Sequence, residues 1–256
     1  MGVSYNPKIV TNGLVLCLDA GNRKSYPGSG NTWTDLSGNA YNATLVNNVS
    51  YSSDNKGTLT FDGTDDYCYV ASSGFFSTTV NNFFADTGYA WTISSWFRFP
   101  VTPAGTRTGN QSWAIFGQSG GIGGGETFTL FVGSATDTTY FASVPYYCLV
   151  GIRGSKTAIS SSSVNTNTWN NVVVTWNGTT AKVYFNGLDR GTANVGAQPI
   201  QTGYYAGIGV TGYTGIINNP PQYFEGNISN TMVYNRAITA SEVLQNFNAL
   251  RGRFNV

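Results

Sequence analysis

Apolar and polar residues alternate most regularly in residues 167–191, NTWNNVVVTWNGTTAKVYFNGLDRG. Successive side chains of a strand point to opposite faces, so this alternation predicts strands with one buried face. The expected interior residues are Val172, Val174 and Trp176, then Ala181, Val183 and Phe185, with Lys182, Tyr184 and Asn186 on the opposite face. Asn-Gly pairs at 177–178 and 186–187 follow these runs, and Asn-Gly readily adopts the two positive φ angles of a type I′ turn. The segment therefore predicts an antiparallel meander of two consecutive hairpins.

The same alternation predicts a core strand at residues 91–99. Its odd positions hold Trp91, Ile93, Phe97 and Phe99, and the residues between them include Thr92, Ser94, Trp96 and Arg98. Further strand-like runs lie at 13–20, at the end of 35–45, on both sides of an acidic turn in 59–70, and at 113–117, 128–132, 140–152 and 224–234. Roughly a dozen strands are enough for two packed sheets, so the pattern predicts an all-β sandwich.

One amphipathic helix is predicted near the end of the chain, at residues 239–250. Thr239 and Glu242 have the spacing of a capping box, in which each side chain satisfies a free backbone amide of the other residue. The predicted apolar stripe consists of Val243, Leu244, Phe247 and Leu250, with Gln245, Asn246 and Asn248 outside it. We expect this short helix to lie against the sandwich.

Composition agrees with many strands joined by many turns. Of the 256 residues, 41% are apolar and only 10% are charged, and 32 are glycine. Sandwiches and barrels commonly reach this length as one domain. We therefore expect a single domain over residues 1–256, in which residues 1–12 can form an N-terminal arm.

Charge and hydropathy argue against two classes of partner. The net charge is +1, from 13 basic and 12 acidic residues scattered without a run, so nucleic acid is not an expected partner. No apolar segment approaches the roughly 20 residues of a membrane helix, and the first residues lack the pattern of a signal peptide. We expect a protein with no membrane partner that is not exported by the general route.

The residue types present argue against several kinds of catalysis. The chain contains no histidine, which excludes Ser-His-Asp and Cys-His nucleophiles and any zinc site that uses histidine. Glycosidases need two carboxylates about 5 Å or more apart, but the glutamates Glu126, Glu225 and Glu242 are isolated from one another. We predict that the protein is not an enzyme, and lyase chemistry based on Tyr, Lys or Arg stays open as the alternative.

The acidic turn containing Asp62, Asp65 and Asp66 is the best candidate metal site. Ca²⁺ prefers several carboxylate and carbonyl oxygens from one flexible loop, although the spacing is not that of an EF-hand. In the alternative interpretation, which we favour, these aspartates accept hydrogen bonds from the backbone of their own turn. Ca²⁺ is therefore the one candidate cofactor.

Exposed aromatic rings are the candidates for carbohydrate binding, because the C–H face of a sugar can rest on them. Four loop aromatics with amide or hydroxyl neighbours fit this requirement: Trp33, Trp113, Tyr213 and Tyr223. Trp91, Trp169 and Trp176 are expected in the core instead. Aromatic residues are also enriched in protein interfaces, so contacts between subunits are the alternative use of these four rings.

The three cysteines, Cys17, Cys68 and Cys148, are isolated and do not have the spacing of a metal site. We expect buried, reduced thiols. Cys17 and Cys68 each lie in a strand-like run and can be neighbours, but a disulfide bond does not follow from the sequence.

Five phrases together resemble a known family. They are GLVLCLDA, DLSGNAYNATL, LTFDGTDDYCYV, WNNVVVTWNGTTAKVYFNG and FEGNISNTMVYNRAITASEVLQNF, in that order along residues 13–247. This series resembles the laminin-G-like domains of the concanavalin-A-like lectin and glucanase superfamily. The resemblance implies a jelly-roll sandwich of one convex and one concave sheet, with ligand sites on the concave face or on rim loops. Ser229 and Asn230 stand where the family often has an acidic residue, which weakens any transfer of an acidic site.

The residues near the two ends of the chain resemble a smaller group within this superfamily. Residues 4–30 and 233–254 look like laminin-G-like structural proteins of tailed bacteriophages, particularly phages of aquatic bacteria. This resemblance implies a non-enzymatic virion surface protein, made in the host cytoplasm, that serves as a capsid decoration or fibre module. The implied partners are the major capsid protein or fibre subunits, further copies of the chain, and cell-surface glycans. The alternatives are a carbohydrate-binding adhesin of a tail fibre and, less favoured, a polysaccharide-degrading enzyme.

Overall fold

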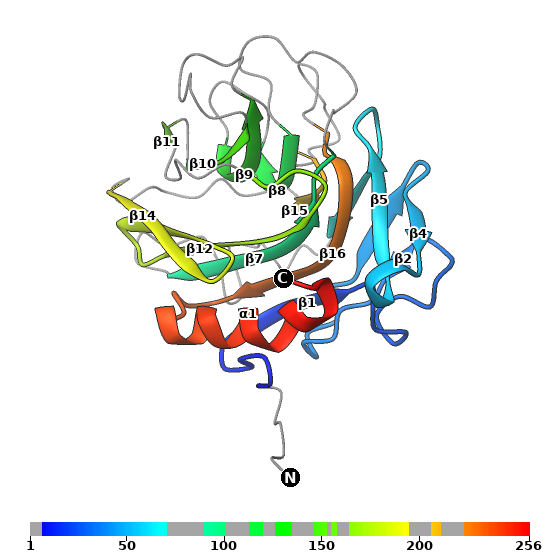
Figure 1. Ribbon diagram of the computed structural model, residues 1–256, viewed down its shortest axis with the longest axis horizontal. Coiled ribbons are helices and arrows are strands. Elements are labelled where there is room, and N and C mark those ends of the chain that lie inside the picture. Colours follow the sequence, from blue (N-terminus) through cyan, green and yellow to red (C-terminus); the bar gives the residue numbers. More distant parts are fainter. Residues whose placement is uncertain are drawn as a thin grey trace.

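The computed structural model describes residues 7–70, 90–100, 113–119, 126–134, 146–152, 155–157, 164–194, 206–210 and 223–256. These residues form two antiparallel sheets, and one α-helix lies on the outside of the sandwich (Figure 1). Sheet A has the strand order β14-β13-β12-β7-β16-β5-β4, and β1 also pairs with β16. Sheet B has the order β11-β10-β9-β8-β15-β6-β3-β2. The predicted all-β sandwich of jelly-roll type with one C-terminal helix is confirmed.

The strands of sheet A are β1 (Leu14–Asp19), β4 (Ser50–Ser52), β5 (Thr58–Asp62), β7 (Trp91–Arg98), β12 (Trp169–Trp176), β13 (Thr180–Phe185), β14 (Leu188–Asn194) and β16 (Glu225–Tyr234). Those of sheet B are β2 (Thr32–Trp33), β3 (Ala43–Val46), β6 (Tyr67–Val70), β8 (Trp113–Ser119), β9 (Glu126–Ser134), β10 (Tyr146–Ile152), β11 (Ser155–Thr157) and β15 (Ala206–Ile208). The helices are the 3-10 turn η1 (Asp54–Lys56) and α1 (Ala240–Phe254).

The meander β12-β13-β14 forms one side of sheet A as predicted, but only one of its two turns is of the expected type. Asn186 and Gly187 both have positive φ, 52° and 76°, as a type I′ turn requires. In the first turn only Gly178 has positive φ, so the type I′ prediction is wrong there. The reason is that the side-chain oxygen of Asn177 accepts hydrogen bonds from the backbone N–H groups of Thr179 and Thr180, and the Asn177 N–H donates to the Thr180 carbonyl, which together close a different turn.

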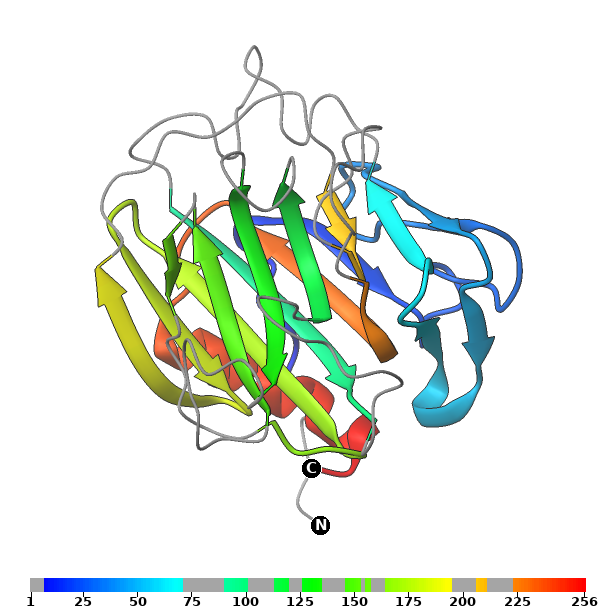
Figure 2. The same ribbon diagram turned by 90° about the horizontal axis from the view of Figure 1, so that it is seen from above.

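The main core lies between the two sheets and contains the predicted inward residues of the meander and of β7. Trp91 and Trp176 face each other across the β7/β12 pairing, with ring centroids 5.8 Å apart. The other faces of these two strands are buried as well, because α1 lies along the outer face of sheet A, away from sheet B (Figures 1 and 2). Within the described residues, no helix is both long enough and apolar enough to cross a membrane.

Helix α1 begins where the sequence predicted, with Thr239 as its N-cap and a complete capping box to Glu242, but it continues to Phe254. Packing against sheet A explains why the helix continues to Phe254. Trp96, on the outer face of β7, stacks against both Phe247 and Phe254 of the helix, with centroids 5.5 and 4.3 Å apart. The C-terminal turn of α1 is therefore fixed by aromatic packing on sheet A.

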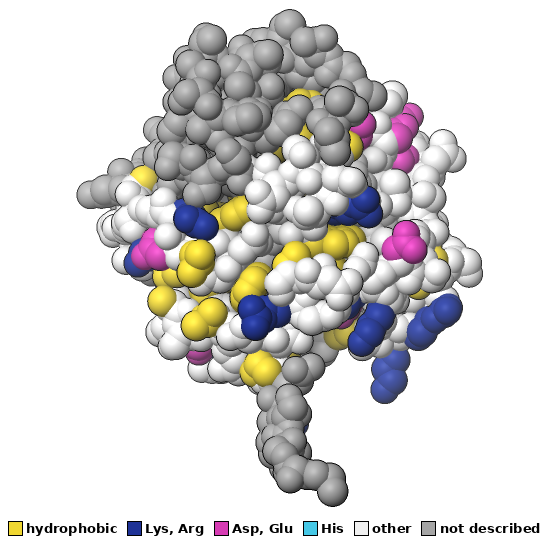
Figure 3. Space-filling view, viewed as in Figure 1, with side chains coloured by type: hydrophobic (Ala, Val, Ile, Leu, Met, Phe, Trp, Pro, Cys, Tyr) yellow, Lys and Arg dark blue, Asp and Glu magenta, His cyan; other side chains and the backbone are white. Residues whose placement is uncertain are grey.

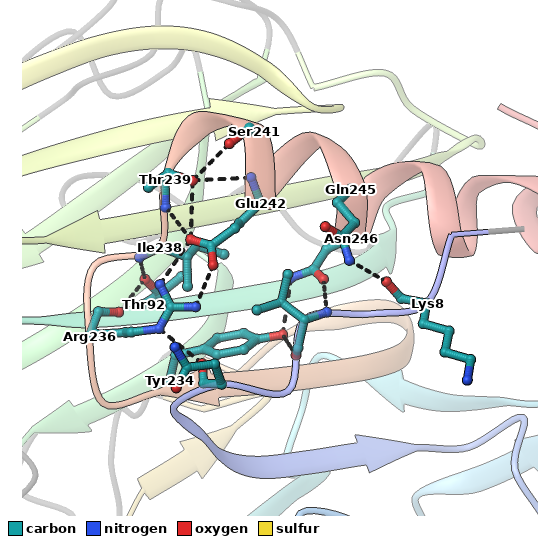
Figure 4. A network of polar contacts seen from close by, with 12 residues as sticks. Lys8, Thr92, Tyr234, Arg236, Ile238, Thr239, Ser241, Glu242, Gln245 and Asn246 are labelled. Atoms are coloured by element: carbon teal, nitrogen blue, oxygen red, sulfur yellow. Dashed lines mark hydrogen bonds and ion pairs between the residues drawn. The ribbon is translucent and has the colours of Figure 1, made fainter.

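The predicted apolar stripe of α1 is wrong at two positions. Leu244 is 46% exposed, whereas Asn246 is only 3% exposed. The Asn246 amide accepts a hydrogen bond from the Val10 backbone N–H at 2.7 Å and donates one to the Tyr234 hydroxyl at 3.0 Å (Figure 4). A buried amide that makes these bonds ties the N-terminal segment and β16 to the helix, which an apolar side chain cannot do.

Cys17 and Cys68 are free, buried thiols, as expected, but they are not neighbours. Cys17 lies in the cluster beneath the helix and Cys68 in the core between the sheets. Burial, with smaller contributions from Asp19 and Asp35, raises the pKa of the Cys17 thiol to about 12. The Cys148 side chain lies outside the described part of the molecule.

Candidate carbohydrate-binding site

The outer face of sheet B carries a row of aromatic rings at β6. Cys68 of this strand faces the core, so the alternation of the strand places Tyr67 and Tyr69 on the outer face. Their ring centroids are 6.3 Å apart, and the ring centroid of Tyr223 lies 6.2 Å from that of Tyr67. Tyr223 is held there by an antiparallel bridge to Val210. We call Tyr67, Tyr69 and Tyr223 the tyrosine cluster.

The two ends of the tyrosine cluster are more accessible than its centre. Tyr67 is only 8% exposed and has both Tyr69 and Tyr223 as ring neighbours, whereas these two residues are partly exposed. Tyr67 therefore acts as the packed support of the cluster, and Tyr69 and Tyr223 provide the ring surface that a ligand can contact.

Small residues border Tyr69 across the sheet. Its backbone pairs with Thr44 of β3 on one side and with Gly207 of β15 on the other. Gly207 in turn pairs with Gly117 of β8. Since glycine carries no side chain, β15 and then β8 present only backbone on that side of Tyr69 at these two paired positions. This arrangement suits a flat ligand lying along the sheet.

The acidic turn adjoins the tyrosine cluster, because it carries the chain from β5 in sheet A to β6 in sheet B. One carboxylate oxygen from each of Asp62, Asp65 and Asp66 lies within 4.8 Å of the others. Acidic side chains gather over this corner at the upper right of Figure 3. Asp62 and Asp65 are exposed, whereas Asp66 is buried.

The backbone of the corner holds two of these carboxylates, as the favoured interpretation of the sequence predicted. Asp62 Oδ1 accepts hydrogen bonds from the N–H groups of Thr64, Asp65 and Asp66 at 2.7, 3.3 and 3.4 Å. Asp66 accepts from the N–H groups of Asn48 and Asp62 at 2.9 and 3.1 Å. A Ca²⁺ site formed by these three aspartates stays a prediction.

Local electrostatics connect the turn to the rings. Burial opposes ionisation of Asp62, but its backbone hydrogen bonds outweigh this and lower its pKa. Burial and the neighbouring carboxylates raise the pKa of Asp66. Burial and the Asp65 carboxylate together raise the pKa of the Tyr223 phenol. This agrees with the position of Asp65 two residues before Tyr67, whose ring centroid lies 6.2 Å from that of Tyr223.

Of the four aromatic residues predicted to bind carbohydrate, two are in the core. Trp33 is fully buried, and Trp113 is 2% exposed with its ring 5.0 Å from Phe99. The prediction that these rings are exposed is wrong, because both belong to strands of sheet B and turn inward. At ~25 cal/mol per Å², burying an aromatic side chain of roughly 200 Å² contributes about 5 kcal/mol before entropic costs. Tyr213 lies outside the described residues.

Tyr223 is the one predicted aromatic residue that the described structure places in the site. Sequence reasoning missed Tyr67 and Tyr69, which stand next to the acidic turn in the printed sequence. Their signal was the alternation YCYV: once Cys68 and Val70 are assigned to the core, both tyrosines must face outward.

The glutamates considered for catalysis lie in unlike surroundings. Glu242 pairs with Arg236 at 2.6 Å and accepts a hydrogen bond from the Thr239 N–H (Figure 4). These interactions, Arg236 first, lower its pKa to about 2. Glu225 is the backbone register partner of Asp62 in the antiparallel pairing of β5 with β16. The Glu126 side chain lies outside the described part. The absence of catalysis stays a prediction.

The fold and the aromatic outer face define a β-sandwich of the carbohydrate-binding type. The sequence model of the concanavalin A-like lectin/glucanases superfamily, in its laminin-G-like form, matches residues 62–244. The chain belongs to this superfamily, as the sequence resemblance implied. No curated protein sequence matches the chain significantly.

Solved structures agree on the fold. Trypanosoma rangeli sialidase in complex with sialic acid is similar with a TM-score of 0.61 and 18% identity, over 97% of this chain and 36% of the sialidase. Domain 4 of AbnA, a GH43 extracellular arabinanase from Geobacillus stearothermophilus, in complex with arabinotriose, has a TM-score of 0.57 and 16% identity, over 91% of this chain and 97% of that domain. The botulinum neurotoxin serotype D binding domain has a TM-score of 0.54 and 12% identity, over 93% of this chain and 52% of that domain. The chain thus spans about a third of the sialidase.

Proposed function

We propose that this protein is a non-enzymatic surface module of a tailed-phage virion that binds glycans through the outer face of sheet B. The observation that carries the glycan part is the tyrosine cluster, which presents partly exposed rings on a sheet of a lectin-type sandwich. The virion part rests on the resemblance of residues 4–30 and 233–254 to phage structural proteins.

The chemistry of the site suits a sugar. The C–H face of a pyranose packs on an aromatic ring, and its hydroxyl groups donate hydrogen bonds to nearby acceptors. Tyr69 and Tyr223 provide rings, and the Asp65 carboxylate provides an acceptor at the same corner. The glycine backbone of the neighbouring strands leaves room for a ligand to extend across the sheet.

The opposite side of the sandwich suits attachment or support better than sugar binding. Helix α1 and the N-terminal segment cover the outer face of sheet A, so that Trp96 and Asn246 are buried there. We infer that this side supports the module, that sheet B faces outward, and that the module assembles with the major capsid protein or fibre subunits.

Glycan binding is tested on an array of cell-surface oligosaccharides with the purified protein and two variants. Tyr69→Ala should lower binding at least tenfold, because it removes a stacking surface while Tyr67 and Tyr223 keep their mutual contact. Tyr51→Ala is the matched control, since Tyr51 is a partly buried tyrosine of β4, at the edge of sheet A. Equal binding by all three proteins would contradict the site, and binding to no glycan would contradict the glycan function.

The virion role needs separate tests. Purified protein should bind phage particles that lack it, and antibodies against it should label intact particles. The protein should release neither reducing ends nor unsaturated products from host polysaccharide. Release of either product would show that the module is an enzyme and would overturn the non-catalytic part of the proposal.

A further inference from the structure

Every charged residue so far assigned to the glycan corner is acidic. Asp62 and Asp65 are exposed at the turn, and the three ion pairs found among the described residues involve none of the three aspartates. Asp65 lies two residues before Tyr67 in the turn, and the Tyr67 ring centroid is 6.2 Å from that of Tyr223; in agreement, the Asp65 charge adds to the effect of burial in raising the Tyr223 pKa. A ligand that stacks on the outer end of the tyrosine cluster therefore meets negative charge.

Asp65 differs from its two acidic neighbours in how its carboxylate is used. The carboxylates of Asp62 and Asp66 accept hydrogen bonds from the backbone. The Asp65 backbone is also fixed, since its N–H donates to Asp62 and its C=O accepts from the Asn47 amide at 2.6 Å. Within the described part of the chain, no hydrogen bond reaches the Asp65 carboxylate itself. The chain thus holds an exposed carboxylate on a fixed backbone, two residues before the central ring of the tyrosine cluster.

This pairing of groups has a preferred ligand chemistry. A carboxylate accepts its strongest hydrogen bonds from a charged donor, and an ammonium group is also attracted to the face of a tyrosine ring. A sugar carboxylate at the same place would face like charge, which disfavours binding. The corner therefore distinguishes glycans by the sign of their charge.

We propose that the tyrosine cluster and Asp65 together select glycans that carry free, protonated amino groups and reject glycans that carry carboxylates. This inference rests on the proposed glycan-binding function and adds the ligand class. In it, Tyr69 and Tyr223 bind the sugar rings, and Asp65 binds the ammonium group of an amino sugar.

The test compares three oligosaccharides of equal length by titration calorimetry at pH 6, where a primary amine is protonated. They are an oligomer of glucosamine, its fully N-acetylated counterpart and an oligouronate. The glucosamine oligomer should bind about tenfold more tightly than the N-acetylated one, and the oligouronate should bind more weakly than both. Raising the salt concentration should weaken binding of the glucosamine oligomer most.

Variants separate this inference from the function on which it depends. Asp65→Asn should bring the affinities for the glucosamine and N-acetylated oligomers to within about twofold, with the N-acetylated affinity unchanged. Asp54→Asn is the control, because Asp54 is an exposed aspartate of η1, away from the β5–β6 corner. Tyr69→Ala should weaken all binding.

Each outcome decides one of the two proposals. If the N-acetylated oligomer binds in a Tyr69-dependent way but the amino form has no advantage, the charge selection is wrong and the glycan-binding function stands. If the amino form keeps its advantage in Asp65→Asn, the assignment to Asp65 is wrong. If no oligosaccharide of any charge binds, here or on the array, both proposals fail.

Discussion

At the scale of single residues, Asn246 shows how one buried polar group can connect three parts of a fold. Its amide bonds the Val10 backbone and the Tyr234 hydroxyl, which in turn donates to the Val10 carbonyl (Figure 4). Burying the Asn246 amide costs little free energy because its hydrogen bonds are made. Its partners are also buried, so they cannot form replacement hydrogen bonds with water. Removing the amide would therefore leave the Val10 N–H without its acceptor, while the Tyr234 hydroxyl keeps its bond to the Val10 carbonyl.

We expect Asn246→Ala to lower the free energy of unfolding by about 2 kcal/mol, the usual penalty for leaving a buried donor unsatisfied and opening a small gap. The measurement is urea denaturation. Asn248→Ala is the control on the same helix, since Asn248 is partly exposed, and it should change the unfolding free energy by less than about 0.5 kcal/mol. Equal effects of the two substitutions would mean that the bonds to Val10 and Tyr234 contribute nothing.

The same residue shows why the helix could be predicted better than its buried face. The capping box is a local signal, so Thr239 and Glu242 marked the start of the helix correctly. Helix periodicity places position 246 on the same face as Val243 and Phe247. A polar asparagine is buried there only because Val10 and Tyr234, which lie outside the helix, bond its amide, and the helix sequence does not show these partners. Likewise, Trp33 is buried because β2 pairs with β3 in sheet B, and the loop-like residues around it in the sequence do not indicate this pairing.

At the scale of elements, the N-terminus of α1 couples the helix to the loop after β16 through Glu242 and Arg236. The Arg236 pair is the main cause that lowers the Glu242 pKa from 4.5 to about 2. A carboxylate with a lowered pKa stabilises the fold when ionised, so this contribution is present above about pH 4.5 and is lost as pH falls through 2. The pair is partly exposed, so solvent screening reduces its contribution to about 1 kcal/mol.

We therefore predict that Glu242→Gln is less stable than the wild-type protein by about 1 kcal/mol at pH 7 and that the difference disappears near pH 2. Urea denaturation of both proteins across this pH range measures it. The other carboxylates titrate alike in both proteins, so their contribution cancels in the difference between the two unfolding free energies. A difference that persists at pH 2 would show that the glutamate acts through packing and not through its charge.

At the scale of the whole molecule, the two outer faces have different roles. Sheet A is closed by α1, whereas β6 of sheet B presents partly exposed aromatic rings beside an acidic turn. The sequence predicted both sheets from local alternation, but it did not place β5 and β6 in different sheets. The crossover carries the acidic turn directly into β6, and the pairing of β6 with β15, followed by the Val210–Tyr223 bridge, brings the distant Tyr223 to the same place. The contribution of Tyr223 to the candidate site is therefore a product of topology.

The topology also bears on the predicted Ca²⁺ site. A Ca²⁺ ion takes 6–8 oxygen ligands, but the Asp62 and Asp66 carboxylates already receive backbone N–H groups, whose dipoles favour the carboxylate and oppose a cation. Such a turn is complete without an ion. Asp65 alone offers a carboxylate without a hydrogen bond from the described residues, and one carboxylate is too few for a specific site.

We therefore expect the thermal unfolding midpoint to be the same, within about 1 °C, with millimolar Ca²⁺ and with a chelator. Calorimetry with both additions, repeated with Asp65→Asn, measures this directly. A rise of several degrees in Ca²⁺ that is lost in the variant would establish the metal site instead. It would also oppose the amino-sugar proposal, because a cation bound at Asp65 would neutralise the charge that the ammonium group needs, and Ca²⁺ would then compete with the glucosamine oligomer. Because backbone N–H groups already bond the Asp62 and Asp66 carboxylates, we expect Ca²⁺ to leave the affinity for the glucosamine oligomer unchanged at constant ionic strength.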